Sequence, residues 1–262
     1  MKTYRVMVGM PCYGQVQALT AQSLWNLSAG NPYCFEVGDR RFEIELELSA
    51  MPIGPYVELH LVDLLERLAE SGCDWMLRID SDMAWTPEWV RHFFERHLEW
   101  VHQDLGQEIY EKWPMIHGGV YPRRQRTQNH TPIIQWRKHH HPDTDAGFVA
   151  KARESYIRGT SDSAARVGGG WCLYNKRCAE LPPETWYVTK GLGEDYGGCD
   201  RVRKAGGSIF ATWPKVGEAE LGHVIQGLDY ATIRDYLTAW AVATGQARAG
   251  VLAENAENGF SG

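Results

Sequence analysis

The sequence predicts an α/β protein in which helices cover both faces of a mostly parallel central sheet. Short buried apolar runs alternate along the chain with segments whose apolar residues recur at helical spacing. The 262 residues suffice for one large domain, and we find no linker or internal repeat that divides them. With 44% hydrophobic and 23% charged residues, the composition excludes a chain that is disordered throughout. We therefore predict a single domain over residues 1–262.

The first half of the chain alternates between predicted strands and predicted helices. Strands are expected at residues 4–9, 42–48, 75–79 and 115–121, and helices at 15–27, 56–70 and 87–103. The run FEIELEL at 42–48 alternates strictly between apolar and acidic side chains, which is typical of a strand with one solvated face. Ligands bind at the carboxyl ends of the strands in such sheets, so Pro11 and Asp80, which follow two of these strands, are candidate site residues.

The second half of the chain is less regular. No regular element is predicted over residues 122–163, and a loop of that length in a compact domain is typical of a functional segment. A strand-like run at 165–174, a helix at 194–205, a strand at 208–212 and a helix at 228–244 follow. We expect the tail from residue 254 to fray.

The six cysteines form no CxxC pair and show no zinc spacing, so we predict reduced, mostly structural thiols. No stretch approaches the roughly 18–20 consecutive apolar residues that a membrane span requires. The N-terminal apolar run is also too short for a signal peptide. We therefore expect a cytoplasmic protein with no membrane partner.

Two motifs in the predicted strands and turns could carry chemistry. Asp80-Ser81-Asp82 places two carboxylates at a strand exit, where both can face one Mg²⁺ or Mn²⁺ ion, or can merely form a turn or a helix cap. Gly168-Gly169-Gly170 leaves the backbone bare for a bulky ligand, although for this motif taken alone a bulged strand without a ligand is the more common explanation.

Two further motifs lie in the second half. Glu194 and Asp195 open a predicted helix, where a carboxylate can act as a general base or simply stabilise the helix start. His223 follows Gly222, and a neutral imidazole is a common metal ligand, although a lone histidine is more often structural.

The order of these four motifs resembles the GT-A class of nucleotide-sugar glycosyltransferases. The resemblance spans roughly residues 4–225 and is carried by Val8-Gly9-Met10-Pro11-Cys12-Tyr13-Gly14, Leu77-Arg78-Ile79-Asp80-Ser81-Asp82-Met83, Gly168-Gly169-Gly170-Trp171-Cys172-Leu173, and Gly193-Glu194-Asp195-Tyr196 running to Ala205-Gly206 and then His223. It implies a single GT-A type, Rossmann-like domain. Its parts would be a nucleotide-sugar-binding half (1–121), a basic loop (122–163), an acceptor and catalytic half (164–227) and a C-terminal helix (228–253).

The resemblance also implies a role for each motif. Asp80, Asp82 and His223 would hold Mn²⁺ or Mg²⁺ against the donor diphosphate, and Asp195, with Glu194 as the alternative, would be the base of an inverting displacement. The nucleotide-sugar donor would contact Pro11, Cys12, Tyr13, Gln15, Asp80, Ser81, Gly169 and Gly170. A UDP-sugar is the expected donor, although residues 48–51 lack the acid that many family members use to read the base.

The acceptor is suggested by the charge pattern of residues 112–142, which contain no Asp or Glu. Basic and aromatic side chains that could grip DNA are Arg123, Arg124, Arg126, Trp136, Arg137 and Lys138. The same arginines could equally serve only the donor diphosphate. Compact enzymes with these motifs resemble those that bacteriophages use to glycosylate hydroxymethylated pyrimidines in DNA, which would place the protein in a host cytoplasm.

We therefore expect a glycosyltransferase whose favoured acceptor is 5-hydroxymethylcytosine in phage DNA. A saccharide or protein acceptor for a surface glycan is the first alternative. A non-catalytic module that only binds nucleotide-sugars is the second alternative, and a nucleotidyltransferase is a weaker third.

Overall fold

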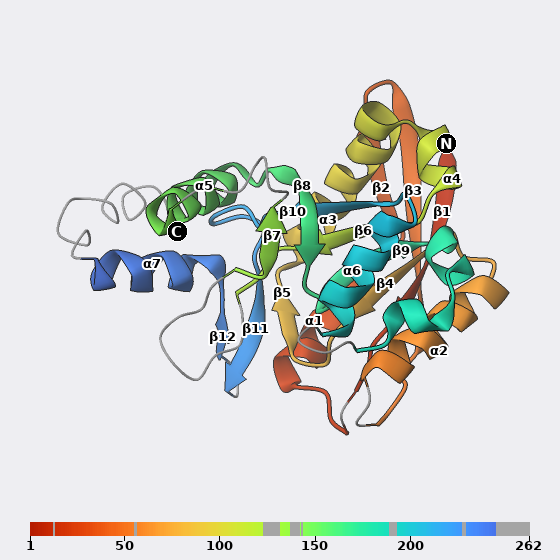
Figure 1. Cartoon of the computed structure of the whole chain (residues 1–262), viewed down its shortest axis with the longest axis horizontal. Helices are drawn as coiled ribbons and strands as arrows, with labels where there is room; N and C mark the ends of the chain where they lie inside the picture. Colours follow the sequence, from red (N-terminus) through yellow and green to blue (C-terminus); the bar gives the residue numbers. More distant parts are fainter. Residues whose placement is uncertain are drawn as a thin grey trace.

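The computed structural model confirms the α/β class (Figure 1). It describes residues 1–12, 14–54, 57–122, 132–136, 142, 144–188, 193–226 and 229–244. In these residues no helix is both long enough and apolar enough to span a membrane. All six cysteines are free thiols, as predicted, and all of them except Cys34 are buried.

A mixed nine-stranded sheet forms the centre of the molecule, in the order β2-β3-β1-β4-β9-β6-β10-β8-β7. Its strands are β1 Lys2–Gly9, β2 Tyr33–Val37, β3 Arg40–Ala50, β4 Trp75–Ile79, β6 Met115–Gly119, β7 Ile134–Trp136, β8 Ser161–Val167, β9 Trp171–Asn175 and β10 Ser208–Thr212. β1 is parallel to β3 and β4, and β6 is parallel to β10, whereas β9 runs antiparallel between β4 and β6. The carboxyl ends of β1, β4, β6 and β10 therefore lie at one edge.

A second, three-stranded sheet has the order β12-β11-β5 and lies beside that edge. Its strands are β5 Met83–Trp85, β11 Leu221–Gln226 and β12 Asp229–Ala231. β5 follows β4 after a short turn and pairs with β11, so the small sheet brings a segment from late in the chain to the end of β4.

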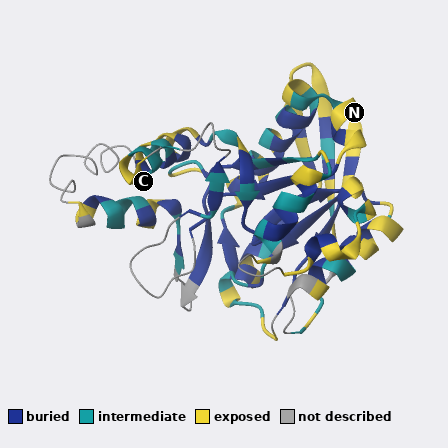
Figure 2. Cartoon of the chain, viewed as in Figure 1, coloured by how far each residue is buried: buried dark blue, intermediate teal, exposed yellow. Residues whose placement is uncertain are grey.

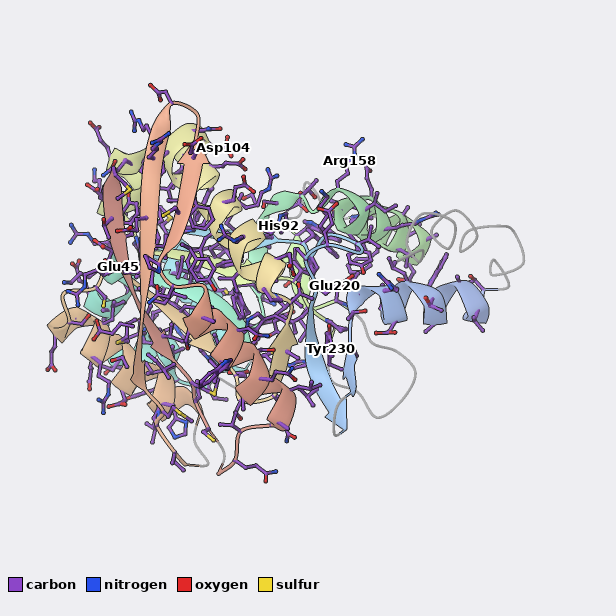
Figure 3. All side chains as sticks on the ribbon, turned by 180° about the vertical axis from the view of Figure 1, so that it is seen from behind. Glu45, His92, Asp104, Arg158, Glu220 and Tyr230 are labelled. Atoms are coloured by element: carbon purple, nitrogen blue, oxygen red, sulfur yellow. The ribbon has the colours of Figure 1, made fainter. Side chains whose placement is uncertain are left out.

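Helices cover both faces of the large sheet (Figures 1 and 3). On one face lie α1 Ala18–Ala29, α3 Pro87–Glu99, the π-helical turn Trp100–Leu105 that continues α3, and α4 Gln107–Lys112. On the other lie α2 Val57–Glu70, α5 Asp145–Arg158 and α6 Glu194–Lys204, with the 3₁₀ turns Lys176–Glu180 and Pro183–Trp186. α7 Ile233–Ala243 packs near α5.

The sheet separates two hydrophobic cores because side chains alternate between its faces. In β1, Val6 and Val8 pack on the side of α3, while Met7 packs on the side of α2. In β4, Leu77 packs on the side of α3 and Met76 packs on the side of α2. Figure 2 shows this buried interior running along the sheet, with exposed residues on the outer helix surfaces.

The prediction that residues 122–163 lack regular structure is wrong, because β7 and α5 form there. The Thr144 side chain caps α5 by accepting a hydrogen bond from the Gly147 amide (3.1 Å), and Gly159 ends it at φ 58°. Val149, Ala152 and Tyr156 are buried along one face. Charged and small residues between them weakened the helical pattern in the sequence.

Two other boundaries also differ from the prediction. Gly168–Gly170 do not lie within a strand but connect β8 to β9 as a turn, so the predicted run at 165–174 is two strands in different parts of the sheet. The final helix begins at Ile233 and not at residue 228, because β12 occupies Asp229–Ala231 first.

Candidate functional site

The turn after β4 is the centre of the candidate site. The Asp80 amide donates a hydrogen bond to the Gly170 carbonyl (3.0 Å), which joins this turn to the glycine turn. The Asp82 carbonyl accepts one from the Val224 amide (2.7 Å), and the pairing of β5 with β11 places His223 opposite Met83. Residues that are about 140 positions apart in the chain are thus held side by side by backbone hydrogen bonds.

Two further hydrogen bonds complete the arrangement. The Gln17 amide donates to the Ser81 carbonyl (3.0 Å), which places the segment before α1 against the β4 turn. The Gly169 amide donates to Asp195 Oδ2 (3.2 Å), which attaches the start of α6 to the glycine turn. All four sequence motifs therefore meet at one edge of the sheet.

Asp80 is held by a buried arginine. Arg78 Nε and Nη2 both donate to Asp80 Oδ1, at 3.1 and 3.0 Å. The Arg78 side chain is 1% exposed and the Asp80 side chain 29% exposed, so the cation lies on the inner side of the carboxylate. The first carboxylate of the motif is consequently oriented by the protein itself.

The glycine turn makes room for protein side chains. A Cβ on Gly169 would lie 2.8 Å from Arg78 Nη1, and a Cβ on Gly170 would lie 2.7 Å from the Tyr121 hydroxyl. The Gly169 amide binds Asp195, and the Gly170 amide donates to the Tyr121 hydroxyl (2.6 Å). Both amides are thus used within the protein, and the prediction that Gly169 and Gly170 contact the donor stays a prediction.

Asp195 lies in the first turn of α6 and is half-buried. Besides the Gly169 amide, its carboxylate accepts a hydrogen bond from the Tyr196 amide (2.7 Å). These two backbone amides hold the Asp195 carboxylate in a fixed position at the helix start. Glu194 begins the same helix, but its side chain lies outside the described residues.

His223 has a defined tautomer. Its Nδ1 lies 2.8 Å from the Pro122 carbonyl, which can only accept a hydrogen bond, so Nδ1 carries the proton. The Tyr121 ring packs edge-on against the imidazole, with the ring centroids 4.7 Å apart. The lone pair on Nε2 is therefore available to a ligand or a metal ion.

The three predicted metal ligands are not already gathered as a cluster. In the part of the chain that the structure describes, no three His, Cys, Asp or Glu side chains are close enough to hold a metal ion. The Asp80 carboxylate accepts hydrogen bonds from Arg78, and this orientation explains why Asp80 does not form a ready-made metal site with Asp82 and His223. The donor chemistry of Asp82 and His223 still fits Mn²⁺ or Mg²⁺, because the Asp82 carboxylate, in the turn just before β5, and the His223 imidazole, on the paired strand β11, are both metal-binding groups.

Of the residues predicted to contact the donor, Pro11 and Cys12 follow β1, which pairs with β4. Pro11 and Cys12 are buried, and the Cys12 amide and carbonyl bond to the Pro52 carbonyl (3.0 Å) and the Gly54 amide (3.1 Å). Gln15 is exposed, whereas Ser81 is buried. Tyr13 lies outside the described residues.

Trp136 does not offer a stacking surface for a nucleobase. It is 2% exposed, its ring stacks on Trp213 with centroids 5.7 Å apart, and its Nε1 donates to Asp162 Oδ2 (3.1 Å). The prediction for this residue is wrong because it is part of the core. The predicted basic contacts Arg123, Arg124, Arg126, Arg137 and Lys138 lie outside the described residues.

Arg78 and Tyr121 are site residues that the sequence did not reveal. Burial, reinforced by the Asp80 and Asp195 carboxylates, raises the pKa of Tyr121 well above its usual value, so its hydroxyl stays neutral. Arg78 appears in the sequence as one polar residue in an apolar strand, and Tyr121 as one more aromatic residue in a tyrosine-rich and tryptophan-rich chain. The signal that identifies them is spatial, since both pack against the glycine turn.

An open cleft of about 720 Å³ lies elsewhere on the molecule, between α3, the end of α5 and the loop before β11, near His92 and Arg158 (Figure 3). Its lining carries charges of both signs, and some of them form ion pairs with near neighbours in the sequence. Arg96 bonds to Glu99 (2.7 Å) and Lys215 to Glu218 (2.6 Å). None of the predicted site residues lines this cleft.

Comparisons with known proteins support the fold. No protein-family profile and no curated protein sequence matches the chain. The crystal structure of A197 from STIV superposes with a TM-score of 0.51 at 12% identity, over 88% of this chain and 91% of that one. UTP-bound UGPase from Acinetobacter baumannii gives 0.33 at 9% identity, over 91% and 72%. The first likeness shows the fold alone, and the second is too poor to carry an argument.

Proposed function

We propose that the protein is a GT-A type glycosyltransferase that moves a sugar from a nucleotide-sugar, with a UDP-sugar as the expected donor, to a hydroxyl group. The observation that supports this proposal most is the gathering of the Asp80–Asp82 turn, the glycine turn, Asp195 and His223 at one sheet edge. Ligands of α/β proteins bind at that edge, where the parallel strands end.

The proposed roles follow from the positions of the side chains. Asp82 and His223, together with Asp80, are the residues that would hold Mn²⁺ or Mg²⁺. The chemistry that such a cation supplies when bound is neutralisation of charge on the departing diphosphate. Asp195 accepts the proton of the incoming hydroxyl, and its two backbone amide contacts keep the carboxylate in place for that transfer.

The favoured acceptor is a hydroxymethylated base in DNA. Its support is the composition of residues 112–142, which carry Lys and Arg but no Asp or Glu in a chain with a net charge of −6. A target base would leave the stack at a cost of a few kcal/mol, which phosphate contacts flanking it could offset. Because Trp136 is buried, the proposed contacts are limited to Arg123, Arg124, Arg126, Arg137 and Lys138.

Nucleoside mass spectrometry tests both the donor and the acceptor. The protein is incubated with Mn²⁺, a panel of nucleotide-sugars, and duplex DNA that contains 5-hydroxymethylcytosine or unmodified cytosine. We expect a sugar mass on the hydroxymethylated base alone. Replacement of Arg123, Arg124 and Arg126 by Ala is expected to reduce this product without changing release of nucleotide in the absence of DNA.

The outcomes separate the alternatives. Release of nucleotide without a modified base would support a glycosyltransferase whose acceptor is a saccharide or a protein and not DNA. Nucleotide binding without release would favour the non-catalytic module. A protein that binds no nucleotide at all would contradict the proposal.

A further inference from the structure

Arg78 is a charged residue at a position where the fold calls for an apolar one. All five residues of β4 are buried, and the Arg78 side chain is 1% exposed. A buried guanidinium is costly to desolvate, and a buried ion pair is often no more stabilising than well-packed apolar residues. Fold stability alone therefore gives little reason for a cation at this position.

A second position is adapted to the same cation. The guanidinium lies against Gly169, where a Cβ would be 2.8 to 3.0 Å from Nη1, Cζ and Nη2. Any larger residue at 169 would displace Arg78 from Asp80. The Gly169 amide at the same time holds Asp195, so the guanidinium lies between the segments that carry the two acidic motifs.

The contacts with Asp80 are one-sided. Both N–H groups bond to Oδ1, and the carboxylate is more exposed than the guanidinium that holds it. The pair fixes the rotation of the Asp80 side chain and leaves Oδ2 outside these two hydrogen bonds. A carboxylate held in this way can accept a hydrogen bond from a ligand without first being ordered.

We propose that Arg78 is a positioning residue for nucleotide binding, which acts by holding Asp80 against the glycine turn. This inference rests on the function proposed above. Arg78 lies beneath Asp80 and does not need to touch the nucleotide. Its loss is predicted to disorder the Asp80 carboxylate and to remove a positive charge from beside the diphosphate.

The test is a double-mutant cycle read by calorimetric titration with UDP in the presence of Mn²⁺. Arg78→Met removes the charge with little change in volume, Asp80→Asn removes the partner charge, and the third variant carries both changes. Each single change is expected to weaken UDP binding by about 10-fold or more, and the double change by little more than either alone. Arg78→Lys is expected to restore thermal stability more fully than UDP affinity, because an ammonium cannot offer the paired geometry of a guanidinium.

Arg166→Met is the matched control, because Arg166 also pairs with a carboxylate through two hydrogen bonds, to Asp200 at 3.0 and 2.6 Å. It is expected to leave UDP affinity unchanged. If Arg78→Met fails to fold, the comparison of Arg78→Lys with wild type carries the test.

The results separate the two proposals. Wild-type UDP affinity in the Arg78 variants, with only a lower Tm, would show a structural role and overturn the inference. Losses that multiply in the double variant would also overturn it, because the two residues would then act independently. A wild-type protein that binds no nucleotide would overturn the proposed function, and this inference with it.

Discussion

At the scale of single residues, the site is defined by which polar atoms the protein already uses. The Gly169 and Gly170 amides and Asp80 Oδ1 are engaged within the protein. His223 Nε2 remains available by virtue of its tautomer. Two predictions concern single residues: Asp82, the proposed metal ligand, and Asp195, the proposed general base.

Asp82→Ala is expected to weaken Mn²⁺ binding by more than about 10-fold, because it removes one of the proposed ligands. Donor binding should weaken with it. Titration of Mn²⁺ followed by electron paramagnetic resonance measures the effect directly. Asp104→Ala, which changes an exposed carboxylate on the π-helical turn, is the control and should bind Mn²⁺ as wild type does. Equal affinity in both variants would exclude Asp82 as a ligand.

Asp195→Asn is expected to lower kcat by about 10²- to 10⁴-fold while leaving donor affinity nearly unchanged, because a general base acts in the chemical step. Steady-state kinetics with donor titration separate kcat from KM. The Gly169 and Tyr196 amides donate to different oxygens of Asp195, so the Asn side chain keeps only one of these hydrogen bonds, and a thermal melt of the variant tests whether the fold survives the loss of the other. Retained transfer would move the base role to Glu194 or indicate a retaining mechanism.

The residue types and their order could be predicted from the sequence, but their contacts could not. Asp80, Asp195 and His223 are candidates from the sequence because strand, helix and glycine signals lie next to them, and their roles stay predictions. The partner of Asp80 could not be identified, because a strand that reads Trp-Met-Leu-Arg-Ile does not show that its arginine folds back onto the following turn. The tautomer of His223 depends on Pro122, about 100 residues away, which no local pattern connects to it.

At the scale of elements, Glu220 joins parts of the molecule that the sequence left separate. Its Oε1 accepts a hydrogen bond from the Tyr156 hydroxyl of α5 (2.5 Å) and lies 3.4 Å from Arg234 Nη2 of α7. The Gly217 amide also bonds to it (3.3 Å). In Figure 3, Glu220 lies beside the start of α7. Burial raises the pKa of Glu220, an effect that Tyr156, Gly217 and Arg234 oppose.

Glu220→Ala is expected to destabilise the protein by about 1–3 kcal/mol, because the buried Tyr156 hydroxyl loses its acceptor. Urea denaturation measures the change. Glu218→Ala is the matched control, since Glu218 forms only a partly exposed ion pair with Lys215 and should change stability by less than about 1 kcal/mol. Equal stability losses in the two variants would contradict the anchoring role of Glu220.

Elements with strong local patterns were predicted well, and those that depend on distant pairing were not. The alternating run at 42–48 lies within β3, and the predicted strands at 75–79 and 208–212 match β4 and β10. β5 and β11 were missed because they pair with each other across about 140 residues of the chain. α5 was missed because its buried face is narrow and is interrupted by charged residues.

At the scale of the whole molecule, neutral buried histidines make stability depend on pH. His97 Nδ1 lies 2.9 Å from His117 Nδ1 in the core beside α3. Burial lowers the pKa of His97 to about 3 and that of His117 well below its usual value. In the unfolded chain each takes up a proton near pH 6.5, whereas in the folded protein they remain neutral.

The protein is therefore expected to lose stability as the pH falls from about 6.5 toward 3, by up to about 1.4 kcal/mol per pH unit for each such histidine. Urea midpoints measured between pH 7.5 and 4.5 give the slope. His97→Gln removes one titrating group and should make the slope shallower, whatever it does to stability at pH 7.5. An unchanged slope would show that His97 is protonated in the folded state.

We propose above that the edge formed by the β4 turn, the glycine turn, α6 and β11 transfers sugar from a nucleotide-sugar with a divalent cation. The most direct measurement is release of free nucleotide from a panel of nucleotide-sugars, with Mn²⁺ or with a chelator, by wild-type protein and by Asp82→Ala. We expect release from at least one donor, and we expect this release to require Mn²⁺ and to be lost in Asp82→Ala. Release that persists equally in the chelator or in Asp82→Ala would contradict it.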